Sequence, residues 1–211
     1  MGFVTLLISF LSFSFMFALF YNYLKTKNSS KLLMFFSFMS YGIGWFLILM
    51  SSYSFESGNT NIGTMLIKSS VIIMSSMALF YSLMLAFLVY PKRVKEASII
   101  GSLLALLIII CVLIYPITFN DGDFIYSIEQ KLSMLPSVLL FFIISYLFIS
   151  FFFKYSKENN VWKSLFFGLG ILVMTAGTLL TVIISADFYN MIFRIVIIAG
   201  IILTFIGSIV K

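Results

Sequence analysis

Residues 190–211 read NMIFRIVIIAGIILTFIGSIVK, an apolar run with one arginine, Arg194, near its start. A transmembrane helix needs about 20 predominantly apolar residues to cross a hydrocarbon core roughly 30 Å thick. This stretch has that length, so it predicts a spanning helix. A cation inside such a helix costs about 2.5–3.5 kcal/mol on insertion scales, which makes Arg194 a candidate functional residue.

The composition extends the same prediction to the whole chain. The sequence is 62% hydrophobic and only 9% charged, whereas a soluble domain is about half apolar and a quarter charged. It contains no histidine, which excludes histidine-ligated metals and haem and every Ser–His or Cys–His nucleophile pair. Its one cysteine, Cys111, cannot form a disulfide within the chain. We expect no cofactor and no metal.

Hydropathy predicts an all-α, polytopic membrane protein that forms a single domain over residues 1–211. The first apolar run is too long for the core of a signal peptide, about 7–15 residues, so we expect it to be retained as a helix. The predicted spans are about 3–24, 31–53, 64–90, 97–117, 132–153, 162–185 and 190–210.

The loops between these spans alternate in charge. Ten basic residues fall on one side and only Lys131 on the other, where most of the acidic residues lie. The positive-inside rule then predicts an outer N-terminus and a cytoplasmic C-terminus in the cell membrane. Because the basic residues form no single patch, we expect the lipid bilayer, and not nucleic acid, as the partner. The ten are Lys25, Lys27, Lys31, Lys92, Arg93, Lys95, Lys154, Lys157, Lys163 and Lys211.

A weak internal repeat accompanies the seven spans. Shifting the chain by 132 residues places the first two spans over the fifth and sixth, and a gap of about six then aligns Lys68 with Arg194. A duplication would give three helices, a linker helix and three more as parallel repeats. Chance similarity between apolar segments is the alternative.

Lys68 and Arg194 each lie about four residues inside a span, near the predicted outer surface. Their long side chains could reach the interface by snorkelling. Arg194 could instead pair with Asp187, two helical turns earlier on the same face. A third interpretation is an outward-facing anion pocket built from both cations, because intramembrane charges often mark a ligand path.

Small and aromatic residues give further candidates. Lys68, Ser75 and Ser82 recur every seven residues on one face of the third span, and glycines and serines line faces of the second and sixth. Such faces favour close helix packing or, alternatively, line a water-filled cavity. Trp45, in the middle of the second span, could line a ligand pocket or pack against neighbours. No catalytic carboxylate pair or phosphate-binding loop is present, so we do not expect an enzyme.

The arrangement resembles the seven-helix N-terminal sensor module of bacterial and archaeal histidine kinases. The resemblance rests on an aromatic second span, KLLMFFSFMSYGIGWFLIL (31–49), a third span that runs into a basic turn, LFYSLMLAFLVYPKRVK (79–95), and an acidic outer loop, ITFNDGDFIYSIEQK (117–131). It implies a prokaryotic sensor with an outer N-terminus. In that family the last helix continues into a signalling domain, whereas this sequence ends at Lys211, so a separate cytoplasmic signalling protein is the expected partner.

Three hypotheses for function follow. The first is a receptor-like module that binds a small anionic or lipidic ligand near the outer leaflet, through Lys68, Arg194, Trp45 and Ser75, and signals to a cytoplasmic partner. The second is a small transporter or channel with the third and seventh spans along its path. The third is a structural subunit of a membrane complex.

Overall fold

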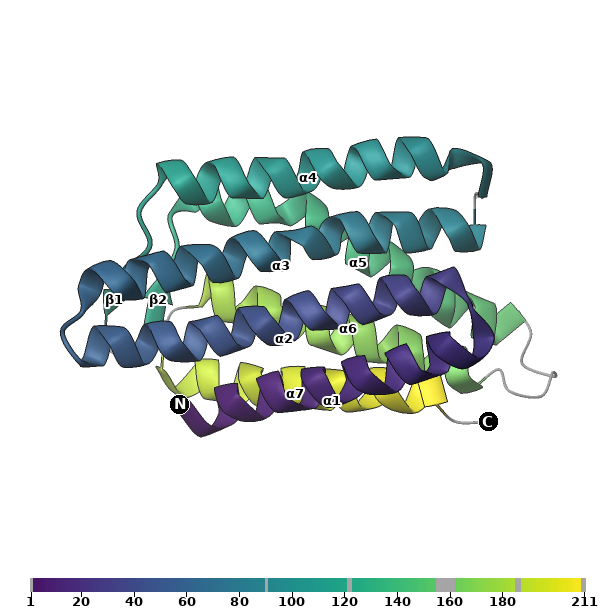
Figure 1. The fold of residues 1–211 in the computed structure, drawn as a ribbon, viewed down its shortest axis with the longest axis horizontal. Coiled ribbons are helices and arrows are strands. Elements are labelled where there is room, and N and C mark those ends of the chain that lie inside the picture. The colour runs from purple at the N-terminus through teal and green to yellow at the C-terminus, as the bar shows by residue number, and fades with distance from the viewer. Residues whose placement is uncertain (1, 90, 121–122, 155–161, 185–186, 210–211) are drawn as a thin grey trace.

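The computed structural model describes residues 2–89, 91–120, 123–154, 162–184 and 187–209, and in these it forms seven long helices and one short hairpin (Figure 1). All seven helices contain a segment long and apolar enough to cross a membrane. The predicted all-α membrane fold is therefore confirmed. The helices are α1 (Gly2–Thr26), α2 (Ser29–Glu56), α3 (Thr60–Val89), α4 (Val94–Ile114), α5 (Ile128–Lys154), α6 (Trp162–Ile183) and α7 (Asp187–Ile209), with a 3-10 turn η1 at Pro91–Arg93.

Several helices extend beyond the predicted apolar runs because polar residues cap them. The side chain of Asn28 accepts a hydrogen bond from the Ser30 N–H and starts α2. At α5, Ser127 and Gln130 bond reciprocally, since each backbone N–H donates to the other's side-chain oxygen. This capping box starts α5 four residues before the predicted span. As a result Pro136 lies inside the helix.

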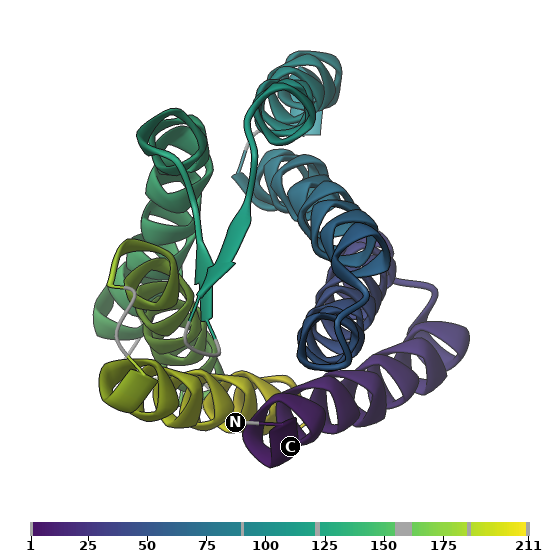
Figure 2. The same ribbon diagram turned by 90° about the vertical axis from the view of Figure 1, so that its left-hand side faces the viewer.

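The helices form a ring in chain order (Figure 2). Each packs against the next, and α7 closes the ring on α1, while α4 packs mainly on α3 and touches α5 only sparsely. Helix α1 begins at one end of the bundle, and α7 ends at the opposite end (Figure 1).

The predicted acidic loop contains a β-hairpin, which the all-α prediction missed. Strands β1 (Thr118–Asn120) and β2 (Asp123–Ile125) pair antiparallel, with Phe119 opposite Phe124. The ring of Phe55 on α2 stacks on that of Phe119, with centroids 4.7 Å apart. Figure 2 shows the hairpin across the middle of the ring at one end. We call this the hairpin end, and the opposite end, which carries Lys25–Lys31 and η1, the basic end.

Glycines of α2, α6 and α7 make close contacts between helices, as the packing interpretation predicts for the faces of the second and sixth spans. A Cβ atom on Gly44 would overlap the side chain of Met74 on α3. Gly170 on α6 and Gly200 on α7 face backbone atoms of the opposite helix, as do Gly177 and Gly207. We call these four residues the α6–α7 glycine seam.

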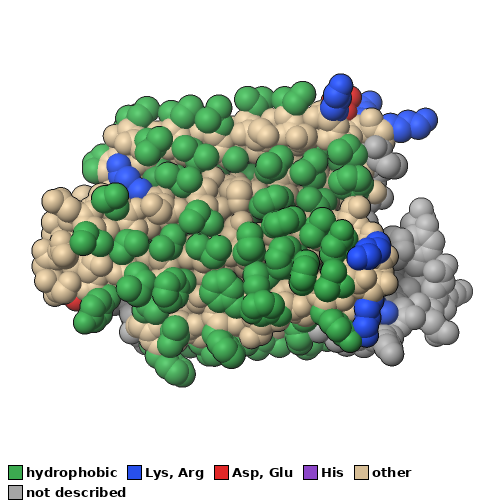
Figure 3. Space-filling model, in the orientation of Figure 1, with side chains coloured by type: hydrophobic (Ala, Val, Ile, Leu, Met, Phe, Trp, Pro, Cys, Tyr) green, Lys and Arg blue, Asp and Glu red, His purple; other side chains and the backbone are tan. Residues whose placement is uncertain are grey.

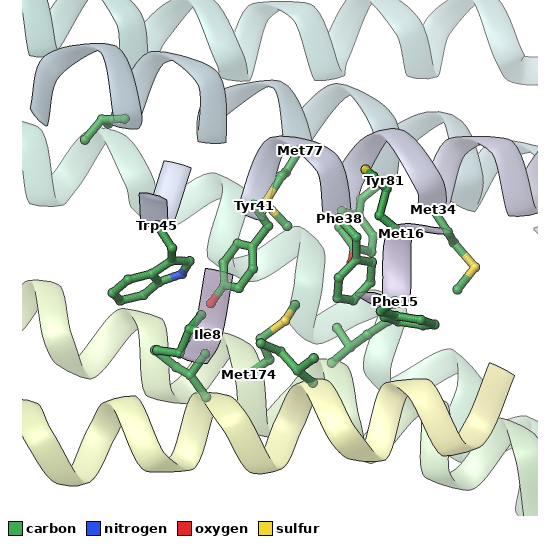
Figure 4. Close-up of a cluster of buried hydrophobic side chains, with 14 of the residues drawn as sticks. Ile8, Phe15, Met16, Met34, Phe38, Tyr41, Trp45, Met77, Tyr81 and Met174 are labelled. Atoms are coloured by element: carbon green, nitrogen blue, oxygen red, sulfur yellow. The ribbon is translucent and has the colours of Figure 1, made fainter. Parts of the chain in front are cut away.

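The basic half of the bundle is filled by an aromatic and methionine core. Phe15 and Phe38 are buried, with ring centroids 4.3 Å apart. In Figure 4 these rings lie toward the basic end, whereas Tyr41 and Trp45 lie toward the hairpin end. The interior therefore changes character along its length.

Basic side chains gather at the basic end in Figure 3, on the described part of the chain. This distribution follows the loop charges from which the orientation was predicted, and the orientation itself stays a prediction. The repeat also stays a prediction. The two cations that it pairs have unlike surroundings, because Arg194 is buried while Lys68 is partly exposed.

Candidate functional site

A cavity of about 310 Å³ lies in the hairpin half of the bundle. Its walls come from α2, α3, α5, α6 and α7, with one residue of α4 and two residues at the hairpin, Phe124 and Tyr126. Most of the lining side chains are apolar. The volume is at the lower end of the range of about 300–1,000 Å³ found for small-molecule sites.

Arg194 lines this cavity and is only 7% exposed. Its Nη1 donates a hydrogen bond of 2.9 Å to Oγ1 of Thr5 on α1, and its guanidinium carbon lies 6.0 Å from the Trp45 ring centroid. A buried charge is tolerated only when polar and aromatic partners replace water. The side chain of Asp187, the predicted partner, lies outside the described residues.

A second cation, Lys131 on α5, lines the same cavity. Its Nζ donates a hydrogen bond of 3.3 Å to the carbonyl oxygen of Ile183, at the end of α6. In the sequence, Lys131 stands out only as the one basic residue of the acidic loops. This position could have indicated a site residue, because a lone cation among acidic outer loops does not help to orient the protein in the membrane.

Lys68 does not line the cavity. Its Nζ donates a hydrogen bond of 3.3 Å to the carbonyl oxygen of Leu113 on α4, near the outside of the ring. Of the three interpretations of these cations, an anion pocket built from both does not fit this placement, because Arg194 lines the cavity and Lys68 is not among its lining residues. The reason is the rotation of α3, which turns Lys68 toward α4 while Arg194 points inward from α7.

Trp45 and Ser75, two other predicted site residues, do line the cavity. The hydroxyl of Ser75 donates to the Ile72 carbonyl at 2.6 Å. The Oγ of Ser137 is buried in the cavity wall without a hydrogen-bond partner among the described residues. Trp45 lies beside Tyr41 (Figure 4), whose hydroxyl hydrogen-bonds Thr178 at 2.9 Å. The wall thus offers polar groups that a bound molecule could engage.

The hairpin covers the cavity and is held by Gln130, which is fully buried. Besides capping α5, Gln130 donates from Nε2 to the carbonyl oxygen of Tyr115 at 3.1 Å, which ties the end of α4 to the start of α5. Burial raises the pKa of the Tyr126 phenol, while the nearby Arg194 charge opposes that rise. Tyr126 is therefore a neutral hydrogen-bonding group at the cavity wall near neutral pH.

Replacing Gln130 with alanine should loosen the hairpin. The change removes the hydrogen bonds that Gln130 makes with the Ser127 N–H and the Tyr115 carbonyl, and it leaves this part-buried carbonyl without its donor. We therefore expect a loss of about 1–3 kcal/mol in unfolding free energy. Thermal melting followed by circular dichroism in detergent measures it. Glu129→Ala, an exposed neighbour in the same turn, is the control and should melt like wild type. Equal melting of both variants would contradict the role of Gln130.

Among the described residues, the lining of the cavity does not extend along α3 to the basic end. Ser82, the next polar residue on the predicted line, packs against Gly101 of α4 and does not line the cavity. Next to Ser82 in the chain, the ring of Tyr81 meets that of Phe141 edge to face, with ring centroids 4.8 Å apart. Phe141 lines the cavity, so this pair forms its floor.

The cavity opens on the side of the bundle between α5 and α6. Its lining includes Leu132 on α5 and Ile183 on α6, which are 57% and 47% exposed on the outer surface. Lys131 bridges these two helices at the same level. In a membrane this opening faces lipid.

The fold and the cavity define a class, a polytopic helical membrane protein with an apolar intramembrane cavity that carries two cations. Comparisons with protein-family models, with curated proteins and with solved structures found no match to this chain. Within the described residues no group of three or more metal-binding side chains occurs.

Proposed function

We propose that this protein is a receptor-like membrane module that binds a small anionic amphiphile in the cavity. The observation that carries the proposal is the pairing of an apolar, intramembrane cavity with the buried cation Arg194. Arginine presents a planar fork of N–H donors that fits carboxylate and phosphate groups. The apolar walls suit the tail of the same molecule.

The closed floor favours a receptor over a channel or transporter. A continuous path would need to pass Ser82 or the Tyr81–Phe141 pair, and both are packed. A purely structural subunit would need no cavity of this size. With the predicted orientation, the cavity lies in the outer leaflet.

Signal transfer would proceed through α7, which holds Arg194 near one end and reaches the basic end with the other. The likeness to sensor modules of histidine kinases supports this proposal, with a cytoplasmic signalling protein as the partner. Helix α1 would take part as well. The side chain of Arg194 donates a hydrogen bond to Thr5, so a ligand that binds Arg194 would change the contact between α7 and α1.

Quenching of Trp45 fluorescence tests ligand binding directly. The chain has two tryptophans, and Trp162 is exposed, so Trp162→Phe leaves Trp45 as the only reporter. We expect 2-bromododecanoate, which carries its bromine beside the carboxylate, to quench Trp45 saturably in phosphatidylcholine nanodiscs, because the Trp45 ring lies 6.0 Å from the Arg194 guanidinium carbon. Arg194→Leu should weaken this binding about tenfold or more, since hydrogen bonds to charged groups contribute about 1.5–3 kcal/mol.

Lys68→Leu is the matched control, because Lys68 is also an intramembrane cation but lies outside the cavity. Its binding should stay within about twofold of wild type, as expected for an exposed charge. Arg194→Lys keeps the charge and should bind with intermediate strength. Gel filtration establishes that each variant is folded. Unsaturable quenching in the wild type, or equal binding by folded Arg194→Leu, would overturn the proposal.

A further inference from the structure

We infer that the ligand is an amphiphile with a single hydrocarbon chain, which reaches the cavity from the bilayer between α5 and α6. The inference rests on the proposed function and specifies its ligand class and route. Three features carry it: the shape of the cavity, the position of its charges and the place where it opens.

The cavity is long and narrow. Along α5 its lining runs from Ile128 to Phe141, which are thirteen residues apart and so about 20 Å along the helix. A volume of about 310 Å³ spread over that length leaves room for one extended chain. A lipid with two chains is larger than the drug-sized molecules that such cavities enclose, so one of its chains would remain outside the cavity.

The charges lie toward one end of this length. Lys131 and Arg194 lie near the hairpin end of α5 and α7, whereas Phe141, Met77 and Met174 line the part nearer the basic end. The indole of Trp45, whose ring lies 6.0 Å from the Arg194 guanidinium carbon, lines the same part of the cavity. An anionic head therefore binds at the hairpin end and the tail points toward the floor.

The opening provides the route. The hairpin closes the end of the cavity with Phe124 and Tyr126, so access from the aqueous side is covered. The side opening is flanked by exposed apolar side chains, Leu132 and Ile183, with Lys131 bridging the helices there. Proline has no backbone N–H, so Pro136 makes no helical hydrogen bond to the Leu132 carbonyl. This weakens α5 at the level of the opening. A molecule already in the outer leaflet meets this opening directly.

Competition between two lipids with the same head tests the number of chains. Lysophosphatidate and phosphatidate share a phosphate and differ in having one or two chains. In the Trp162→Phe protein we expect lysophosphatidate to displace 2-bromododecanoate and phosphatidate to fail at tenfold higher concentration. Equal displacement by both would overturn the single-chain inference and leave the proposed function standing. Absence of saturable binding by the probe itself would instead overturn the proposed function.

Chain length provides a second readout that depends on the floor. Phe141→Ala lengthens the cavity and should move the preferred chain of a fatty-acid series to longer members than in wild type. Phe141→Leu, a smaller change, should shift the preference less and guards against loss of folding. An unchanged chain-length preference in both folded variants would overturn the assignment of Phe141 as the floor for the tail.

Discussion

Gly200→Leu should abolish the folded protein. A Cβ atom on Gly200 would overlap the backbone nitrogen of Met174 on α6 and lie 2.8 Å from its Cα. Overpacking costs about 1–3 kcal/mol where neighbouring side chains can move aside. Here the obstacle is backbone, so α6 and α7 must separate, and we expect a larger loss than that range.

The measurement is the yield of monodisperse protein in detergent by gel filtration, with thermal melting of whatever remains. Ala199→Leu is the matched control, because Ala199 is the adjacent residue and is exposed on the outer surface of α7. It adds similar bulk toward lipid and should behave as wild type. A Gly200→Leu protein with wild-type yield and melting would contradict the α6–α7 glycine seam.

Phe38→Ala should destabilise the bundle by about 3 kcal/mol, the low end of the range for buried Phe→Ala changes. Phe38 is fully buried and its ring packs edge to face on Phe15, with centroids 4.3 Å apart. The low end applies because lipid tails are as apolar as the protein interior. The loss comes mainly from packing contacts around the new void.

Unfolding in sodium dodecyl sulfate, followed by circular dichroism, measures this free energy. Phe10→Ala is the control, because Phe10 is 65% exposed toward lipid on the neighbouring helix α1. It removes the same ring and should change the unfolding free energy little. Similar losses for the two variants would contradict the position of the core.

Hydropathy alone was enough to predict the seven helices, because length and apolar content determine which segments can span a bilayer. The same signal gives the depth of a residue but not the direction in which it faces. Lys68 and Arg194 have matching depths, yet only Arg194 points into the cavity. That direction depends on the rotation of each helix, which is set by contacts such as the close packing of the Met74 side chain on Gly44.

The hairpin and the start of α5 were missed for a different reason. The acidic residues of this loop indicate its side of the membrane but not its conformation. The conformation follows from short-range hydrogen bonds and aromatic contacts. Ser127 and Gln130 have the spacing of a capping box, which could have moved the predicted start of the fifth span and placed Pro136 inside it. The stacking of Phe119 on Phe55 joins segments far apart in sequence and leaves no local pattern.

The α6–α7 glycine seam has a consequence for the forces between helices. A hydrogen replaces the missing Cβ at each glycine, and at Gly170, Gly177 and Gly207 that direction meets a carbonyl oxygen of the opposite helix, within 3.0 Å of the Cβ position. So close an approach of backbone to backbone permits Cα–H···O contacts, which are worth about 0.5–1 kcal/mol each. Such contacts do not depend on the release of water, so they should persist equally in detergent and in lipid. The α6–α7 pair should therefore be the last part of the bundle to separate when the membrane is dissolved.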